Sequence, residues 1–217
     1  MFDTPLYSYL ATCIIAYLIG ALPFGLLVAK SRGVDIRAVG SGNIGATNVF
    51  RCIGKAWGLF VYVLDMLKGL LGATLLPSLF SAQPDPDMWL CTAGGCAAIA
   101  GHNWPVYLRF KGGKGIATTS GFLLGLAPVA VGVGLAAWIV IFVISRFVSL
   151  ASILAAVSVA AFSWMHYGAE ERMLAAVLSA LCILAVLRHR QNIVRLLSGT
   201  ENRFDFKKKG DETQSKT

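Results

Sequence analysis

Long apolar runs separated by short polar loops dominate this sequence. The first runs from Tyr7 to Ala29, and later ones cover 56–80, 88–104, 116–144, 149–167 and 173–187. With 56% hydrophobic residues among 217, the chain has more apolar surface than one soluble core of this size can bury. The first run is long enough for a helix that crosses a bilayer core of about 30 Å. The sequence therefore predicts an all-α fold, a polytopic membrane helix bundle.

The segment from Ile116 to Ile144 is too long for one upright span. Its 29 residues would form a helix of about 43 Å, whereas the apolar core of a bilayer is about 30 Å thick. Pro128 allows two passes, 116–126 and 128–144, and this division leaves Arg146 on the same side as the basic carboxyl-terminal segment. We therefore predict about seven membrane helices, the fourth of them short or re-entrant.

Basic residues set the predicted orientation. The chain has 19 Lys and Arg against 11 Asp and Glu, a net charge of +8. With the helices above, 17 of the 19 basic residues lie on one side, Arg172 lies on the other, and Lys68 lies within a span. The positive-inside rule makes the basic side cytoplasmic, with the amino terminus outside and the carboxyl terminus in the cytoplasm. This distribution explains the charge without a nucleic-acid partner.

A loop of glycines and lysines is the clearest candidate binding site. Glycines expose consecutive backbone N–H groups and the lysines add positive charge, so the loop predicts an anion site, most simply for phosphate. It is not a nucleotide-binding Walker loop, because Leu108 stands where a glycine is required and Lys114 is followed by Gly115. His102 precedes the loop, either as part of the site or as an interfacial histidine. The loop consists of Lys111, Gly112, Gly113, Lys114 and Gly115.

A second polar loop, 40–48, lies on the same predicted side. It offers neutral hydrogen-bonding groups with little bulk. The alternative is a flexible turn in which Ser41 or Asn43 caps the helix that leads to Arg51. The neighbouring basic loops favour the binding interpretation. The candidate binding residues of this loop are Ser41, Asn43, Thr47 and Asn48.

Two ionisable residues, Asp65 and Lys68, interrupt the second apolar run. They are three positions apart, so they share one helix face. Charges within a span are unfavourable unless they are paired or face a polar cavity. Two interpretations stay open, namely an ion pair that locks helix packing and a pair that supports the polar site.

No metal-binding spacing of Cys and His occurs, and no Ser-His-Asp triad can be assembled without an arbitrary choice of partners. We therefore expect no cofactor and no metal, and direct transfer between two bound substrates rather than a covalent acyl-enzyme. The helical pattern of 188–197 places His189 and Asn192 on one face, as a continuation of the last span. A transporter for a phosphorylated solute is an alternative. The gathering of the polar motifs on one side favours an enzyme over a transporter or a structural scaffold.

Four motifs carry a resemblance to a known family. SGNIGATNVFR (41–51), DMLKG (65–69), GHNWPVYLRFKGGKGIAT (101–118) and RHRQNIVRLLSGTE (188–201) resemble the bacterial acyl-phosphate:glycerol-3-phosphate acyltransferases, the PlsY family. The resemblance covers nearly the whole chain. It implies transfer of a fatty acyl group from acyl phosphate to the 1-hydroxyl of glycerol 3-phosphate. The products are lysophosphatidic acid (1-acyl-glycerol 3-phosphate) and phosphate, in the first acylation of phospholipid synthesis.

The resemblance also implies location and organisation. It predicts a multi-pass enzyme of the bacterial cytoplasmic (inner) membrane, in contact with membrane lipids and with its active site facing the cytoplasm. The residues themselves predict a single membrane-embedded catalytic domain at 1–206, and the lysines at 207–209 followed by polar residues predict a disordered cytoplasmic tail at 207–217, which lies outside the family motifs. The resemblance argues against acyl coenzyme A as donor, although the basic surface alone would permit it. It indicates neither the acyl-chain preference nor the oligomeric state.

Particular residues take roles from the resemblance. An essential serine corresponds to Ser41 and an essential arginine to Arg37 or Arg51, while the glycine-lysine loop binds the phosphate of glycerol 3-phosphate. We expect Ser41, Arg51, Lys114 and the loop amides to hold one phosphate, and His189, Asn192 and Ser149 to orient the other substrate. Either His189 or a phosphate oxygen of the donor accepts the hydroxyl proton. The expected catalytic residues are Ser41, His189 and Asn192. The expected substrate-binding residues are Arg37, Asn43, Thr47, Asn48, Arg51, His102, Lys111 to Gly115 and Ser149. Structural support is expected from Asp65, Lys68 and Glu201.

Overall fold

A computed structural model of the protein describes residues 4–204, so the predicted tail at 207–217 lies outside the described residues. Within 4–204 all regular structure is helical, which confirms the predicted class. The helices are α1 (Leu6–Gly20), α2 (Phe24–Ser31), α3 (Ala46–Cys52), α4 (Lys55–Ala73), α5 (Leu75–Phe80), α6 (Met88–Asn103), α7 (Ile116–Leu126), α8 (Pro128–Ser145), α9 (Val148–His166), α10 (Arg172–Arg188) and α11 (Arg190–Leu197), with a 3-10 turn at Val106–Leu108.

The predicted apolar runs coincide with helices or with pairs of helices. The first run is α1 and α2, the second is α4 and α5, and the other predicted segments match α6 to α10. By length and composition, four stretches of the described residues can cross a membrane, namely α1 with α2, α4 with α5, α8, and α9; the bent pair of α10 and α11 would make a fifth if it is one span. Since α7 has only 11 residues, it is about 16 Å long and cannot cross alone. The arrangement with seven membrane helices therefore stays a prediction.

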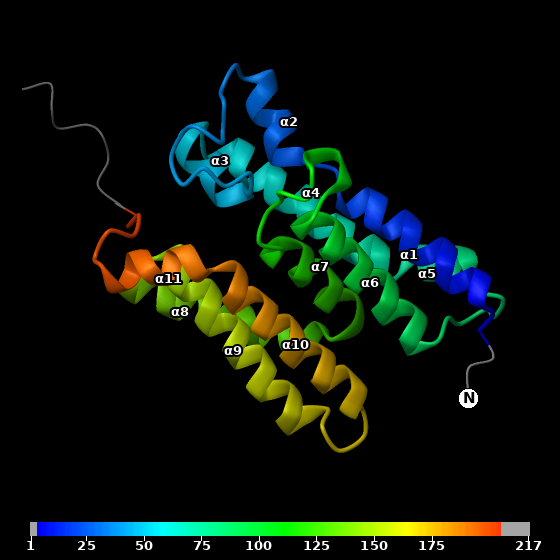
Figure 1. The fold of residues 1–217 in the computed structure, drawn as a ribbon. Coiled ribbons are helices and arrows are strands. Elements are labelled where there is room, and N and C mark those ends of the chain that lie inside the picture. The colour runs from blue at the N-terminus through cyan, green and yellow to red at the C-terminus, as the bar shows by residue number, and fades with distance from the viewer. Residues whose placement is uncertain (1–3, 205–217) are drawn as a thin grey trace, which may run out of the picture.

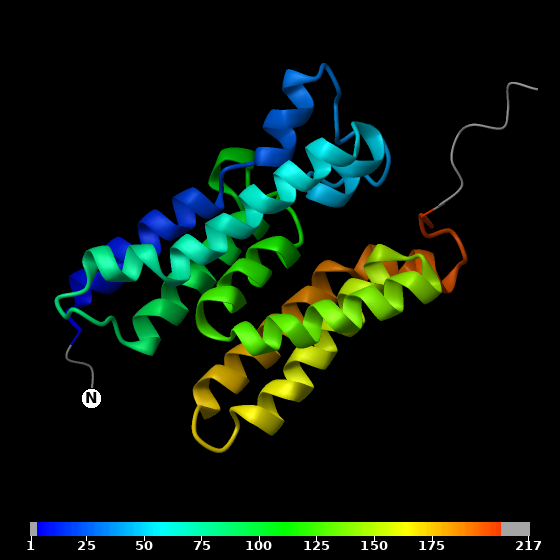
Figure 2. The same cartoon turned by 180° about the vertical axis from the view of Figure 1, so that it is seen from behind.

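The helices form two groups that meet along a shared core. Figures 1 and 2 show α8 to α11 side by side, apart from the group that contains α1 and α4 to α7. The chain passes from one group to the other at Ala127, where α7 ends and Pro128 begins α8, as the sequence predicted. Buried side chains of both groups fill the space between them, among them Ile99 and Phe122 from one and Leu174 and Leu178 from the other.

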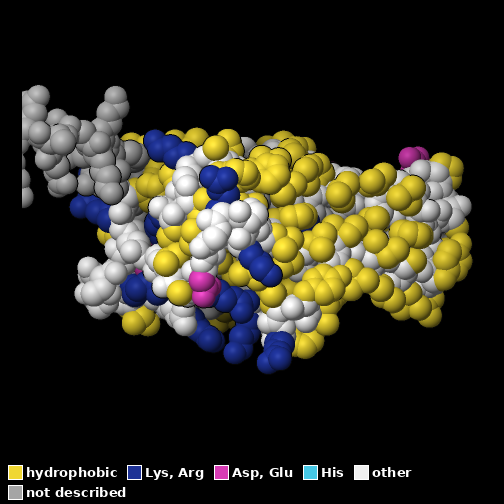
Figure 3. All heavy atoms as spheres, turned by 90° about the horizontal axis from the view of Figure 1, so that it is seen from above, with side chains coloured by type: hydrophobic (Ala, Val, Ile, Leu, Met, Phe, Trp, Pro, Cys, Tyr) yellow, Lys and Arg dark blue, Asp and Glu magenta, His cyan; other side chains and the backbone are white. Residues whose placement is uncertain are grey.

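The surface separates apolar sides from one basic end. In the view of Figure 3, the blue Lys and Arg side chains gather at one end of the molecule, and yellow apolar side chains cover most of the remainder. Helix α8 has only one buried residue, Ala130, and exposes large apolar side chains such as Leu135, Val143 and Ile144. An apolar helix exposed in this way is typical of a lipid-facing segment.

The last two helices correct one prediction. The segment 188–197 is not a straight continuation of the last span, because the axes of α10 and α11 differ by 57°. The bend lies at His189, whose backbone N–H donates to the carbonyls of Ala185 and Val186. Its ring Nδ1 also bonds the Ala185 carbonyl, at 2.7 Å. The Ala185 carbonyl therefore accepts from both the backbone and the side chain of His189 at the bend.

Candidate active site

The glycine-lysine loop folds back against the end of α6. Its Gly113 N–H donates to the His102 carbonyl at 3.1 Å. A Cβ atom on Gly113 would overlap the ring of His102, so this position requires glycine. Gly115 begins α7 with φ of 81°, a left-handed conformation that favours glycine. The loop is therefore a close-fitting cover on α6, and its glycines serve packing and turning as well as any ligand.

Behind the loop lies a buried group of ionisable side chains, Asp65, Lys68 and His102, which we call the helix-break cluster. Lys68 Nζ lies 2.7 Å from Asp65 Oδ1 and donates to the carbonyls of Gly20 at 3.0 Å and Leu22 at 2.9 Å. These carbonyls belong to the break between α1 and α2, where helical partners are missing. The predicted ion pair is confirmed, and it closes the end of α1.

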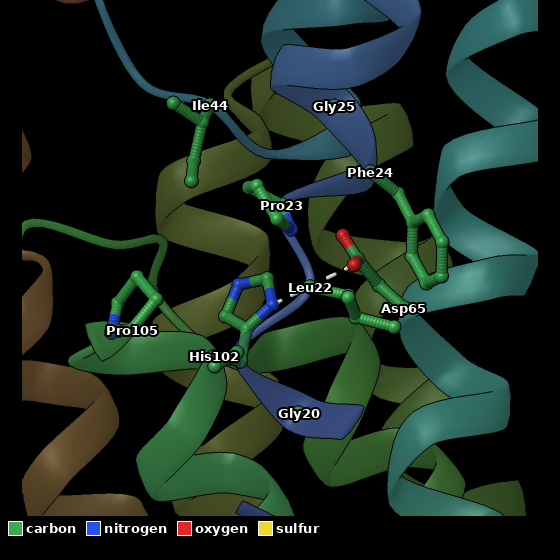
Figure 4. Close-up of a pocket in the computed structure, with 10 residues that line it drawn as sticks. Gly20, Leu22, Pro23, Phe24, Gly25, Ile44, Asp65, His102 and Pro105 are labelled. Atoms are coloured by element: carbon green, nitrogen blue, oxygen red, sulfur yellow. Dashed lines mark ion pairs between the residues drawn. The ribbon is translucent and has the colours of Figure 1, made fainter. Parts of the chain in front are cut away.

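His102 connects this cluster to the loop. The His102 Nδ1 atom lies 3.3 Å from Lys68 Nζ and 3.6 Å from Asp65 Oδ1. Figure 4 shows the side chains of His102 and Asp65 facing each other at the break between α1 and α2. The cavity between them is about 10 Å³, about the space of a single water molecule. This cavity is too small for glycerol 3-phosphate. His102 is thus placed beneath the loop, against the helix-break cluster.

On the other side of the loop, a chain of hydrogen bonds crosses three further segments. Lys114 Nζ donates to Asn192 Oδ1 at 2.5 Å, and Asn192 Nδ2 donates to Glu201 Oε1 at 2.7 Å. The same carboxylate accepts from Ser149 Oγ at 2.9 Å and from Arg195 Nε at 2.7 Å. The structure therefore brings together Lys114, Asn192, Glu201 and Ser149, which the sequence placed in one site.

Arg188 is a member of this region that the sequence analysis missed. Its Nε donates to the Gly113 carbonyl at 3.1 Å, and its Nη2 donates to the carbonyls of Asn103 at 3.2 Å and Gly112 at 3.3 Å. Arg188, Asn192 and Arg195 are spaced at i, i+4 and i+7, as on one face of a helix, and this spacing could have predicted that Arg188 lies near the site. The loop is consequently held from two sides, by His102 and by Arg188. Because the Gly113 N–H is occupied by His102, the expectation that every loop amide binds phosphate is wrong for Gly113.

The first polar loop organises itself through Asn48. This side chain is 1% exposed, donates to the carbonyls of Ile36 at 3.0 Å and Val39 at 3.1 Å, and accepts from the Ser41 N–H at 2.9 Å. The expectation that Asn48 binds substrate is therefore corrected, since its amide is fully engaged by the loop. Ser41 and Thr47 stay partly exposed on the same loop.

Asn43 does not cap α3, and neither does Ser41. The N-cap of α3 is Gly45, without a side-chain hydrogen bond, so the helix-capping alternative is wrong. Asn43 Oδ1 instead accepts from the Gly45 N–H at 2.8 Å, which turns the chain before the helix. Arg37 joins the two loops, because its Nη2 donates to the Lys111 carbonyl at 3.0 Å.

The charges near Lys114 do not balance. Burial lowers the pKa of Lys114 to about 8; Glu201 partly offsets this shift, and Arg195, Arg51 and Arg188 add to it. We call these five side chains the cationic cluster. Burial alone would raise the pKa of Glu201, but hydrogen bonds from Arg195 and its neighbours hold it below its ordinary value. Three partly buried arginines and one carboxylate thus act on the ammonium of Lys114, and this excess of positive charge favours an anionic ligand.

His189 lies at the bend beside the cationic cluster and is 2% exposed. Burial, and then the charge of Lys114, lower its pKa to about 4, so the ring is neutral near pH 7. Because a carbonyl only accepts, Nδ1 carries the proton toward Ala185, and Nε2 is the acceptor. The described residues, 4–204, contain no group of three or more His, Cys, Asp or Glu side chains placed to hold a metal ion.

The sequence profile of the family described as "Glycerol-3-phosphate acyltransferase" matches residues 10–199. The chain belongs to this family. It is 44% identical over 192 residues to the glycerol-3-phosphate acyltransferase of Aquifex aeolicus, covering 88% of this chain and 96% of that one. It is 46% identical over 196 residues to that of Desulforudis audaxviator, covering 89% and 94%.

Solved structures agree with this assignment. Crystal structures of PlsY, an integral membrane glycerol 3-phosphate acyltransferase, match with TM-scores of 0.83 in the glycerol 3-phosphate form and 0.81 in the lysophosphatidic acid form. The first is 41% identical, and the match covers 91% of this chain and 96% of that one. This chain is thus an integral membrane glycerol-3-phosphate acyltransferase with several apolar helices. The cationic cluster and the two polar loops are the parts of this acyltransferase that suit anionic substrates.

Proposed function

We propose that the enzyme transfers a fatty acyl group from an acyl phosphate to the 1-hydroxyl of glycerol 3-phosphate and releases lysophosphatidic acid and inorganic phosphate. One observation carries the proposal: the buried Lys114 lies within the electrostatic reach of three arginines, Arg51, Arg188 and Arg195, but of only one carboxylate, Glu201. Two phosphate-bearing substrates would supply the negative charge that balances these cations. An acyl phosphate is also already activated, so the site needs to position the acceptor and neutralise phosphate charge rather than build a nucleophile.

In this proposal Lys114, Arg51 and Ser41 bind one phosphate. Lys114 is oriented by Asn192, and the glycine-lysine loop that carries it is held in place by Arg188. A lysine that is already desolvated gains most from an incoming anion, because the anion replaces the solvation that burial removed. Asn192, through Glu201 and Ser149, keeps the ammonium aimed at the site.

The chemical step needs one proton acceptor. The 1-hydroxyl oxygen of glycerol 3-phosphate attacks the acyl carbonyl carbon, and the bond from that carbon to the phosphate oxygen breaks. His189, with a pKa of about 4, is a weaker base than a phosphate oxygen, whose second pKa is about 6 in a phosphoester. We therefore assign the hydroxyl proton to the departing phosphate. His189 Nε2 accepts a hydrogen bond from the 2-hydroxyl of glycerol 3-phosphate and so orients the 1-hydroxyl for attack, which leaves the 1-hydroxyl proton to the phosphate.

Sidedness is part of the proposal. The Lys and Arg side chains gather at one end of the molecule in Figure 3, and the positive-inside rule assigns such an end to the cytoplasm. We propose that the enzyme lies in the bacterial inner membrane with this end in the cytoplasm, and that residues 1–206 form one catalytic domain. There the site meets water-soluble glycerol 3-phosphate and a lipid-tailed donor together.

The direct test uses purified enzyme with labelled glycerol 3-phosphate and either acyl phosphate or acyl coenzyme A of the same chain length. We expect labelled lysophosphatidic acid and one equivalent of phosphate with acyl phosphate only. Product formed from acyl coenzyme A at a comparable rate would overturn the donor assignment. No product from either donor would overturn the proposed reaction.

The role of His189 has its own test. If Nε2 only orients the hydroxyl, His189→Ala lowers kcat at saturating substrates by about tenfold to a hundredfold, and His189→Gln, which retains an acceptor, recovers part of the loss. Unchanged turnover in His189→Ala would remove this residue from the mechanism.

A further inference from the structure

The last four described residues, Glu201 to Phe204, cross from one helix group to the other; we call them the carboxyl-terminal strap. Glu201 anchors the strap to α9 and α11 through Ser149 and Asn192. The next residue, Asn202, offers its carbonyl to Arg51 Nη2 of α3 at 3.2 Å. The strap therefore connects the part of the site on α3 to the part on α11.

Phe204 is the far attachment of the strap. Its ring centroid lies 5.6 Å from that of Phe50 and 5.5 Å from that of Phe142, the latter edge to face. Its backbone N–H donates to the Arg146 carbonyl at 2.9 Å. The ring is thus fixed by α3 on one side and α8 on the other, with its backbone tied to the turn after α8.

The guanidinium of Arg51 lies over this fixed ring, with Cζ 5.0 Å from the ring centroid. Stacking on the ring restrains the plane of the guanidinium, and the bond to Asn202 restrains rotation within that plane. Burial lowers the pKa of Arg51, with Glu201 acting in the opposite direction. An arginine held on an aromatic face keeps further N–H groups for an anion, and its rotamer entropy is already reduced before the anion arrives.

We propose that Phe204 is a positioning residue that holds Arg51 for its phosphate ligand. The inference rests on the proposed function, because it takes Arg51 as a phosphate-binding residue. It adds that the strap beyond Glu201 is part of the machinery for substrate affinity, although Phe204 itself does not contact substrate. Without the aromatic ring, Arg51 keeps its charge, but its guanidinium is free to rotate away from the orientation that binds phosphate.

The experiment measures kcat and KM for both substrates in Phe204→Ala, Phe204→Leu and Phe204→Tyr. We expect Phe204→Ala and Phe204→Leu to raise KM for one phosphate substrate about threefold to thirtyfold, the range of a cation–π contact from partly exposed to desolvated. We expect kcat to change less than twofold, and Phe204→Tyr to stay near wild type. Leu keeps apolar bulk, so it separates loss of the aromatic face from loss of packing.

Arg203→Ala is the matched control. It removes a contact of the same kind from the same strap, the guanidinium of Arg203 over the Phe147 ring at 5.8 Å, without touching Arg51. We expect wild-type KM. Equal effects of Arg203→Ala and Phe204→Ala would overturn the proposal, as would wild-type KM in Phe204→Leu.

A double-mutant comparison separates this inference from the function on which it rests. Arg51→Ala alone must raise KM for a phosphate substrate, and Phe204→Ala must then add less than twofold in the Arg51→Ala background. If Arg51→Ala leaves KM unchanged, the phosphate role of Arg51 in the proposed function fails. If Arg51→Ala acts but Phe204→Ala raises KM equally in both backgrounds, Phe204 works through general packing and the inference alone fails.

Discussion

The helix-break cluster and the cationic cluster lie on opposite sides of the glycine-lysine loop and balance their charge differently. In the first, Lys68 has a carboxylate at 2.7 Å and two backbone carbonyls from the break in the first apolar run. In the second, Glu201 pairs with Arg195 alone, and three arginines act on the ammonium of Lys114. The comparison shows that buried charge serves the fold where the chain supplies the partners, and serves binding where a partner must arrive.

The two clusters act on the same loop. His102 of the helix-break cluster accepts the Gly113 N–H through its carbonyl, and Arg188 of the cationic cluster binds the Gly113 carbonyl. One side is thus a fixed support and the other carries the charge for the ligand. Variants of the first should change stability most, and variants of the second should change activity most.

The largest expected effect is on stability, in Lys68→Met. This change leaves Asp65 buried without its cation, which destabilises by about 3–5 kcal/mol. The melting temperature in detergent, followed by intrinsic fluorescence, should fall by roughly 6–20 °C. Lys55→Met, at an exposed position on the same helix, is the control and should melt as wild type. The double variant Asp65→Asn/Lys68→Met should recover much of the loss, and a double variant as unstable as Lys68→Met would refute charge pairing as the cause.

Lys114→Gln tests the other side of the comparison. Loss of the ammonium should lower kcat/KM for glycerol 3-phosphate about 30- to 1,000-fold, since truncation of a buried charge that pairs with a ligand removes about 2–4 kcal/mol. The melting temperature should stay equal or rise, because the change relieves repulsion from neighbouring arginines. Steady-state kinetics and the same melting assay decide the matter. A clear fall in melting temperature would place Lys114 with the residues that serve the fold.

Gly113→Ala tests whether both clusters hold one loop geometry. The added Cβ would overlap the His102 ring, so the loop or the buried ring must shift. A displacement of about 1 Å can reduce catalysis about a hundredfold, and we expect KM for glycerol 3-phosphate to rise roughly tenfold to a hundredfold. Gly132→Ala on α8, where a Cβ meets nothing within 4 Å, is the control. Wild-type kinetics in Gly113→Ala would show that the loop tolerates displacement.

The smallest expected effect is that of pH. With a pKa of about 8 in the free enzyme, Lys114 is mostly protonated at pH 7 and mostly neutral at pH 9, so KM for glycerol 3-phosphate should rise about tenfold over this interval. The contribution of Lys114 to the free energy of unfolding changes in the opposite direction to the affinity for glycerol 3-phosphate. Between pH 8 and the ordinary value of 10.5 the unfolded chain binds more protons at this position, so its contribution to stability rises with pH. Lys114→Arg should flatten the KM profile, and a flat wild-type profile would contradict the shifted pKa.

The positions of the helices followed from the sequence. Apolar run length and Pro128 predicted the division between α7 and α8, and the spacing of Asp65 and Lys68 predicted their ion pair. Both inferences rest on local geometry, the rise per residue and the 3.6-residue turn, which do not depend on how helices pack. The family motifs likewise indicated Lys114, Asn192 and Glu201, which share one hydrogen-bond chain.

The partners of the polar groups depended on tertiary structure. Arg188 reaches the carbonyl of Asn103, 85 positions away, and Arg51 reaches that of Asn202, 151 positions away. The inward turn of Asn48 and the 57° bend at His189 were equally hidden. The sequence states which groups can donate or accept, but the packing of the two helix groups decides which of them meet. That packing sums many weak contacts along their shared core, and no local pattern encodes it.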